Sequence, residues 1–167
     1  DSSIKAFKRF LTRQMPSFRD ERTSILSRAG DLPEQLAEAI AQLDRSTLAI
    51  QGPPGTGKTY VSALAISRLV ASGQRVAISS NSHKAIENLL VATARRMDDD
   101  AIAGQLVQEV SDGDAAPAPD PLLVVTANES PETDAAASVG GTAWHFARYD
   151  EHAFHYLFTD EAGQVSV

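Results

Sequence analysis

Several features that mark particular classes of protein are missing from this sequence of 167 residues. It contains no cysteine, which excludes disulfide bonds and thiolate metal sites. It has no apolar run near the roughly 18 residues of a membrane-spanning helix, and it does not open with a signal peptide. We therefore expect a cytoplasmic chain with one sizeable core and no membrane partner. Because the first residue is Asp1 rather than Met, the chain is typical of a piece of a longer protein or of a processed product.

Lys and Arg are absent from one long segment. Between Asp98 and Asp134 the sequence has ten acidic residues and no basic one, and this segment sets the sign of the net charge of −7. Elsewhere basic residues outnumber acidic ones by 15 to 12, so the net charge does not argue against a nucleic-acid partner. Within residues 98–120 the large apolar residues are Ile102, Leu106, Val107 and Val110, and we predict one short helix followed by a mobile loop over residues 111–119. Residues 128–134 are predicted to be a second polar loop.

The N-terminal segment carries the opposite charge. Over residues 2–14, Ile4, Phe7 and Leu11 fall on one face of a helix, and the basic residues lie mostly elsewhere. Two interpretations stay open. The helix either packs on the domain as a solvated element, which we prefer, or forms an arm that binds nucleic acid.

One stretch fits the phosphate-binding loop pattern G-x-x-x-x-G-K-[ST]. Its residues are Gly52, Pro53, Pro54, Gly55, Thr56, Gly57, Lys58 and Thr59. Glycines let backbone N–H groups turn toward a triphosphate, and a helix beginning near Gly57 directs its positive end at the same charge. Lys58 would reach the β- and γ-phosphates, and the Thr59 hydroxyl would ligate Mg²⁺. A Gly/Pro-rich turn without a ligand is disfavoured, because an apolar run precedes the loop and a helical pattern follows it.

Strand and helix patterns alternate around this loop. Strands are predicted at residues 48–51, 75–80, 122–126, 136–142 and 155–159, and helices over residues 31–44, over residues 57–72 and from His83 onward. Asp31 is expected to cap the first of these helices, and Gly73 to end the second. A strand, a helix and a strand at this spacing form a βαβ unit. We therefore predict an α/β fold with a parallel sheet.

Polar residues follow two of these strands at the edge where open α/β sheets bind ligands. Asp160 and Glu161 follow the last strand. Beside a phosphate loop, Asp160 would hold Mg²⁺ and Glu161 would position and deprotonate the attacking water, although acids at a strand end are common in any protein. Asn81, Ser82 and His83 follow the second strand, either as ligand contacts or as an ordinary helix cap.

An aromatic cluster comes late in the chain. Trp144, Phe146 and Tyr149 lie close to Arg148 in the sequence. Aromatic side chains near arginine can stack on nucleic-acid bases, but such clusters more often belong to a core. We favour core packing for Phe146 and leave the two interpretations open for Trp144.

Taken together, these residues resemble superfamily 1 helicases, in particular the branch of nonsense-mediated-decay and replication nuclease-helicases. The resemblance rests on Gln-Gly-Pro-Pro-Gly-Thr-Gly-Lys-Thr at the loop, on Asp-Glu-Ala-Gly-Gln from Asp160, and on Gln35, which stands 17 residues before Gly52. Asn-Ser-His-Lys and Gly-Gly-Thr-Ala-Trp bring the chain closer still to bacterial proteins that join a RecB-type nuclease to such a helicase.

The resemblance implies a first RecA-like domain, a parallel sheet between two layers of helices, over residues 31–167, with residues 1–30 as an upstream connecting segment. It implies that Gln35 recognises the adenine of ATP, and that Gln164 senses the γ-phosphate or links to a second domain. It also implies contacts with single-stranded nucleic acid, DNA rather than RNA. The residues concerned are Asn81, Ser82, His83, Thr142 and Trp144.

The same resemblance limits what the chain can do by itself. The family uses a second RecA-like domain that carries arginine fingers, and an arginine finger is worth roughly 10³–10⁵ in rate in related phosphoryl transfer. We therefore expect this chain alone to bind ATP and Mg²⁺ with little turnover. Its expected partners are the second domain and an attached RecB-type nuclease domain in the same parent chain. The rival hypothesis is a P-loop switch or assembly ATPase without a nucleic-acid role.

Overall fold

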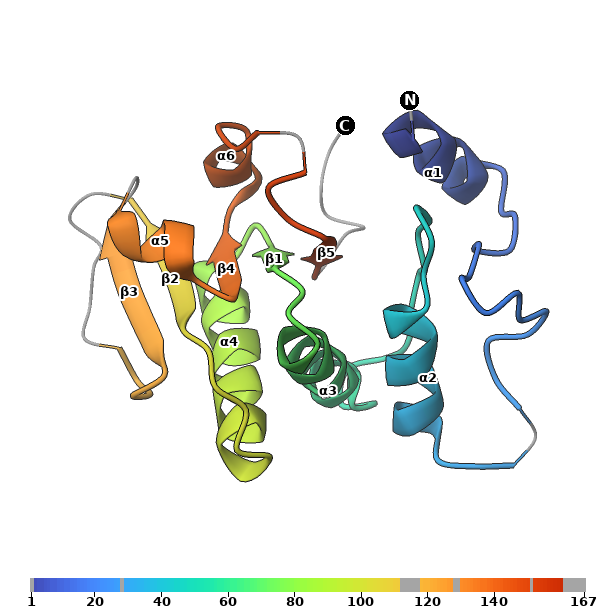
Figure 1. Ribbon diagram of the computed structural model, residues 1–167, viewed down its shortest axis with the longest axis horizontal. Coiled ribbons are helices and arrows are strands. Elements are labelled where there is room, and N and C mark those ends of the chain that lie inside the picture. The colour runs from blue at the N-terminus through green and yellow to red at the C-terminus, as the bar shows by residue number, and fades with distance from the viewer. Residues whose placement is uncertain (1, 28, 112–117, 128–129, 151, 161–167) are drawn as a thin grey trace. The chain divides into compact units, whose positions relative to one another are not determined.

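The computed structural model describes residues 2–27, 29–111, 118–127, 130–150 and 152–160 (Figure 1). The chain divides into two compact units, residues 1–65 and residues 66–167. Helix α3, Lys58–Ala71, begins in the first unit and ends in the second. No helix among these described residues is long and apolar enough to cross a membrane.

The first unit contains two helices, α1 (Ser2–Leu11) and α2 (Leu32–Ala41). The predicted start of α2 is confirmed: the side chain of Asp31 accepts a hydrogen bond from the backbone N–H of Glu34 at 3.3 Å. Pro33 stands in the first turn, where a missing N–H costs the helix nothing. The helix buries one apolar face, made of Ala37, Ala39 and Ile40.

The strand predicted at residues 48–51 is wrong. These residues are irregular and pair with no strand in the described part of the chain, and Ile50 is 37% exposed. A short apolar run records that a segment tends to be extended, but a strand also needs a backbone partner on a neighbouring strand. Four apolar residues in a row do not show whether such a neighbouring strand exists.

Helix α3 ends where the sequence predicted. Gly73 has a φ of 76°, a left-handed conformation that side chains disfavour. The backbone N–H groups of Gly73 and Gln74 donate to the carbonyls of Val70 and Leu69 at 2.9 Å each. This arrangement satisfies carbonyl groups that the end of a helix would leave without partners.

The second unit is built on a five-stranded sheet in the order β3-β2-β4-β1-β5. The strands are β1 (Val76–Ser79), β2 (Leu106–Val110), β3 (Leu123–Ala127), β4 (Ser138–Gly141) and β5 (Tyr156–Thr159). Every pair of neighbours runs parallel. The predicted parallel α/β sheet flanked by helices is thus confirmed, as are four of the five predicted strands.

Strand β2 replaces the short helix predicted ahead of the loop at residues 111–119. All five residues of β2 are buried, including Gln108 and Glu109. A strand inside a parallel sheet is covered on both faces, so it shows no alternation of polar and apolar residues. The acidic residues near β2 in the sequence also argued against a buried strand. The polar loop predicted at residues 128–134 also contains a short helix, α5 (Pro131–Ala135).

Helix α4, His83–Asp99, packs on β2, β3 and β4. The side chains of Ile86 and Leu90 lie so close to β4 that a Cβ atom on Gly140 would stand 2.4 Å from Ile86 and 2.7 Å from Leu90. Glycine is therefore the residue that lets this helix approach the sheet. A four-residue helix, α6 (Ala143–Phe146), follows β4 directly.

Candidate functional site

The loop at residues 52–59 turns on two glycines with positive φ, Gly55 at 80° and Gly57 at 82°. Only glycine adopts such angles at no steric cost. The hydroxyl of Thr56 donates to the carbonyl of Pro53 at 2.8 Å and closes the turn. A Cβ atom on Gly52 would lie 2.6 Å from that hydroxyl oxygen, so the start of the loop also needs glycine.

The ammonium of Lys58 lies over this loop. Its Nζ donates to the carbonyls of Gly52 at 2.7 Å and Pro53 at 3.0 Å. Helix α3, 14 residues long, begins at the same lysine, and Thr59 in its first turn is exposed. A cation, a helix N-terminus and a glycine-shaped turn at one place form an arrangement that can bind a polyphosphate. The loop therefore fits the triphosphate that the sequence predicted for it.

Gln35, in the same unit, has its side-chain amide held by the main chain upstream of α2. Its Oε1 accepts from the backbone N–H of Ser27 at 2.6 Å, and its Nε2 donates to the carbonyl of Ala29 at 3.3 Å. Gly30, which follows, has a φ of 122°, and a Cβ atom there would lie 2.9 Å from the Gln35 Nε2. The amide is thus part of a specific contact rather than a solvated surface group.

In the second unit, the carboxyl ends of the parallel strands carry several of the predicted residues along one edge of the sheet. Asp160 follows β5, and its backbone N–H donates to the carbonyl of Ser79, the last residue of β1, at 2.9 Å. Ser82 and His83 come after β1, and Thr142 comes after β4. Glu161 and Gln164 lie outside the described residues.

Ser82 has a structural task at this edge. It is the N-cap of α4, where its hydroxyl oxygen accepts from the backbone N–H of Ala85 at 3.3 Å. The cap interpretation is therefore confirmed for this residue. The next residue, His83, receives a hydrogen bond on its carbonyl from the Gln108 amide at 3.0 Å.

Thr142 is joined to His145 of α6. The backbone N–H of Thr142 donates to the His145 Nδ1 at 3.1 Å, and the two side chains meet at 2.7 Å between Oγ1 and Nδ1. Because the backbone N–H can only donate, Nδ1 is an acceptor here, and the hydroxyl of Thr142 donates to it as well. The ring of His145 meets that of His83 edge to face, with centroids 6.2 Å apart.

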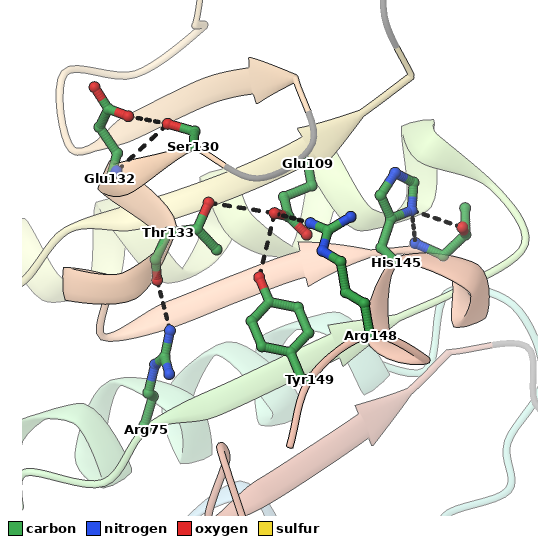
Figure 2. Close-up of polar contacts among 9 residues, drawn as sticks. Arg75, Glu109, Ser130, Glu132, Thr133, His145, Arg148 and Tyr149 are labelled. Atoms are coloured by element: carbon green, nitrogen blue, oxygen red, sulfur yellow. Dashed lines mark hydrogen bonds and ion pairs between the residues drawn. The ribbon is translucent and has the colours of Figure 1, made fainter. Parts of the chain in front are cut away.

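A buried carboxylate that the sequence did not reveal anchors this part of the sheet (Figure 2). Glu109 on β2 is fully buried, and its Oε1 forms an ion pair with Arg148. The same oxygen accepts from the hydroxyls of Tyr149 at 3.2 Å and Thr133 at 3.3 Å. Strand β2, helix α5 and the segment after α6 thus meet at one oxygen. No local sequence pattern indicates it, because the partners lie 24 to 40 positions away from Glu109.

Burial shifts two titrating groups beside this carboxylate. Burial lowers the pKa of His145 below the usual range of histidine, and the nearby Glu109 carboxylate opposes that shift while Arg148 and His83 add to it. Burial also raises the pKa of the Tyr149 phenol, and the charge of Glu109 raises it further. His145 is therefore neutral near pH 7, in agreement with its role as an acceptor for Thr142.

The aromatic residues after β4 divide into two groups. Phe146 packs against the buried Val107, Ala136 and Val139 and meets the ring of Phe154 at 5.5 Å between centroids, so its predicted core role is confirmed. Trp144, two positions earlier, is 88% exposed. Core packing is thus excluded for Trp144. In the described ranges, no three His, Asp or Glu residues gather closely enough to hold a metal ion.

Comparison with known proteins places the chain in a family. The family described as an AAA domain matches residues 31–114, half of the chain. This chain belongs to the AAA domain family. The match includes Gln35 and the loop at residues 52–59, and it ends before Thr142 and Asp160. Together with the parallel sheet, it identifies this AAA domain as a RecA-like α/β P-loop fold.

This AAA domain is also similar to a curated protein, the DNA replication ATP-dependent helicase/nuclease DNA2 of Saccharomyces cerevisiae. The two are 39% identical over 83 residues, which make up 46% of this chain and 6% of the relative. The AAA domain thus spans only a small part of the relative's length. No solved structure matches it.

Proposed function

We propose that this chain is the first RecA-like domain of an ATP-dependent superfamily 1 helicase, and that it binds ATP and Mg²⁺ at the loop of residues 52–59. The observation that carries the proposal is the position of the Lys58 ammonium, 2.7 Å from the Gly52 carbonyl over a turn shaped by glycines. Membership of the AAA domain family and similarity to a helicase/nuclease support it. We also propose that this helicase is most similar to bacterial proteins that join a RecB-type nuclease to a helicase.

Each residue of the nucleotide site has a chemical task in this proposal. Lys58 neutralises the β- and γ-phosphates, and the backbone of residues 52–57 surrounds them. Thr59 and Asp160 would hold Mg²⁺, which would supply positive charge beside the phosphates. Glu161 accepts a proton from the attacking water, and Gln164 senses the γ-phosphate.

Gln35 supplies recognition of the base. A primary amide pairs with adenine through one donor and one acceptor, since adenine presents the N6 amino group beside the N7 acceptor. The Gln35 amide makes one hydrogen bond of each kind with the main chain, at Ser27 and Ala29. It can therefore discriminate adenine from guanine, whose corresponding edge has two acceptors and no donor.

The edge beyond β1 and β4 provides the proposed nucleic-acid contacts. Polar groups for the phosphate backbone come from residues 81–83, and from Thr142 once its hydroxyl leaves the His145 Nδ1, because a phosphate oxygen only accepts hydrogen bonds. Trp144 is exposed on the helix that follows, where an indole ring can stack on a base. Single-stranded DNA is the proposed ligand, in line with the name of the similar DNA replication protein.

Turnover in this proposal depends on a second RecA-like domain of the same parent chain, which supplies arginine fingers. A RecB-type nuclease domain is the further proposed partner in that chain. The rival, a P-loop switch or assembly ATPase, has the same nucleotide site but no nucleic-acid edge. The two differ in whether single-stranded nucleic acid accelerates ATP hydrolysis by the full-length protein.

The nucleotide site is tested by the variant Lys58→Ala. Hydrogen bonds to charged groups contribute roughly 1.5–3 kcal/mol each, so affinity for a fluorescent ATP analogue should fall by at least about tenfold. Lys8→Ala, a change of an exposed lysine on α1, is the matched control and should leave the affinity unchanged. Equal affinities in the wild-type and Lys58→Ala proteins would refute the assignment of the loop.

A further inference from the structure

The amide of Gln35 contacts the main chain of two residues of the same unit, Ser27 and Ala29. The backbone N–H of Ser27 donates to its Oε1 at 2.6 Å, and the backbone carbonyl of Ala29 accepts from its Nε2 at 3.3 Å. One main-chain donor and one main-chain acceptor thus occupy one hydrogen-bonding position at each end of the amide. Adenine offers the same pair of groups through its N6 amino group and N7.

The segment is shaped to make this contact. The Ser27 hydroxyl donates to the carbonyl of Ala29 at 2.5 Å, which holds the turn closed on itself. Gly30 has a φ of 122°, and a Cβ atom at that position would stand 2.9 Å from the Gln35 Nε2. A residue other than glycine would therefore be strained there and would crowd the amide.

Gln35 is in turn fixed at the start of α2. Its backbone N–H donates to the carbonyl of Asp31, the N-cap residue, at 3.1 Å. The side chain therefore starts from a residue fixed in a helix, and Ser27 and Ala29 reach it from the irregular segment upstream.

We propose that the main-chain N–H of Ser27 and the carbonyl of Ala29 compete with adenine for the amide of Gln35, so that this contact sets how strongly the site prefers ATP over other nucleoside triphosphates. This rests on the proposed function, in which Gln35 recognises the base. ATP must displace these two groups to pair with the same donor and acceptor of the amide, and its apparent affinity is reduced by the fraction of protein in which the contact is closed. GTP and inorganic tripolyphosphate bind through the phosphate loop alone and leave the contact in place.

The test compares variants of the full-length protein in calorimetric titrations with ATP, GTP and tripolyphosphate. Ser27→Pro removes the N–H that Gln35 accepts from together with the hydroxyl that donates to Ala29, so Ser27→Ala, which removes the hydroxyl alone, is measured beside it. Since one hydrogen bond contributes about 0.5–1.5 kcal/mol, ATP affinity should rise about threefold to tenfold, while affinities for GTP and tripolyphosphate stay unchanged. Leu26→Pro puts the same ring one position earlier and keeps the Ser27 N–H, so it should behave like the wild-type protein.

Gln35→Ala distinguishes base recognition by Gln35 from competition by the main chain of Ser27 and Ala29. If this variant keeps the wild-type preference for ATP over GTP, Gln35 does not recognise the base and that part of the proposed function is wrong. If the preference disappears in Gln35→Ala but ATP affinity is unchanged or lower in Ser27→Pro, only the competition is overturned.

Hydrogen exchange on the unsubstituted protein keeps the proposal testable if Ser27→Pro does not fold. The amide proton of Ser27 should exchange several-fold faster when ATP is bound, because its acceptor has been taken by the base. Tripolyphosphate should leave the rate unchanged. Equal or slower exchange with ATP would show that adenine and the segment do not compete.

Discussion

Arg148 forms an ion pair with Glu109, whose side chain is fully buried in the middle of the sheet. The arginine follows α6, and the carboxylate belongs to β2, so the pair joins the segment after α6 to a strand four elements earlier. Tyr149 and Thr133 donate to the same carboxylate oxygen. This contact holds in place the segment that carries Thr142 and Trp144.

The first prediction concerns the cost of breaking this pair. Arg148→Ala leaves a buried carboxylate without its counter-charge, and removal of one partner of a buried pair typically costs about 3–5 kcal/mol. The free energy of unfolding, measured in urea, should fall by that order. Glu109→Gln in the Arg148→Ala background should recover part of the loss, because the buried group is then neutral. A loss below about 1 kcal/mol in Arg148→Ala would contradict the role given to the pair.

The second prediction concerns pH. Burial holds the pKa of His145 below its ordinary value of about 6.5. Between the unfolded and the folded pKa of His145, the unfolded chain binds a proton that the folded chain does not bind. The unfolded state therefore gains stability relative to the folded one as the pH falls through this range. The stability contributed by neutral His145 is fully present above about pH 6.5 and is lost as the pH falls toward the folded pKa.

The measurement is the unfolding midpoint between pH 7.5 and pH 5. His145→Gln keeps an acceptor for the Thr142 N–H but cannot titrate, so its midpoint should vary less over this range. The groups that face His145, namely Glu109, Arg148 and His83, are the same in both proteins. Parallel pH profiles for the wild-type protein and the variant would show that His145 does not contribute.

The third prediction concerns Trp144. Its indole is 88% exposed, so Trp144→Ala should leave the unfolding midpoint within the experimental error. A base stacked on an aromatic ring contributes about 1–3 kcal/mol, so affinity for a single-stranded oligonucleotide should fall roughly fivefold or more. Trp144→Phe keeps a ring and should retain most of the binding. Unchanged affinity in Trp144→Ala would remove this residue from the proposed edge.

Helices α2, α3 and α4 were predictable because the signals that start and stop them are local. Asp31, Ser82 and Gly73 each sit at a helix end and make the hydrogen bonds that their residue types favour. The turn at residues 52–59 was predictable for the same reason, since its glycines and its lysine act on neighbouring atoms; phosphate binding there stays a prediction. In such places a few consecutive residues supply all the groups that form the cap or the turn.

Features that depend on distant partners were not predictable in this way. Strand β2 has two polar residues, Gln108 and Glu109, and is recognisable as a strand only through its neighbours β3 and β4. The segment at residues 48–51 is apolar but irregular. The contact of Gln35 with residues 27 and 29 was not predictable, because main-chain groups are the same in every residue type and an irregular segment has no sequence pattern.

The central claim is that the site at residues 52–59 serves a helicase. It is tested most directly by the rate of ATP hydrolysis of the full-length protein with and without single-stranded DNA. We expect single-stranded DNA to raise the rate of ATP hydrolysis at least about tenfold. Glu161→Gln should abolish this increase while ATP binding persists. A rate that neither single-stranded DNA nor RNA changes would contradict the account and favour a P-loop switch or assembly ATPase.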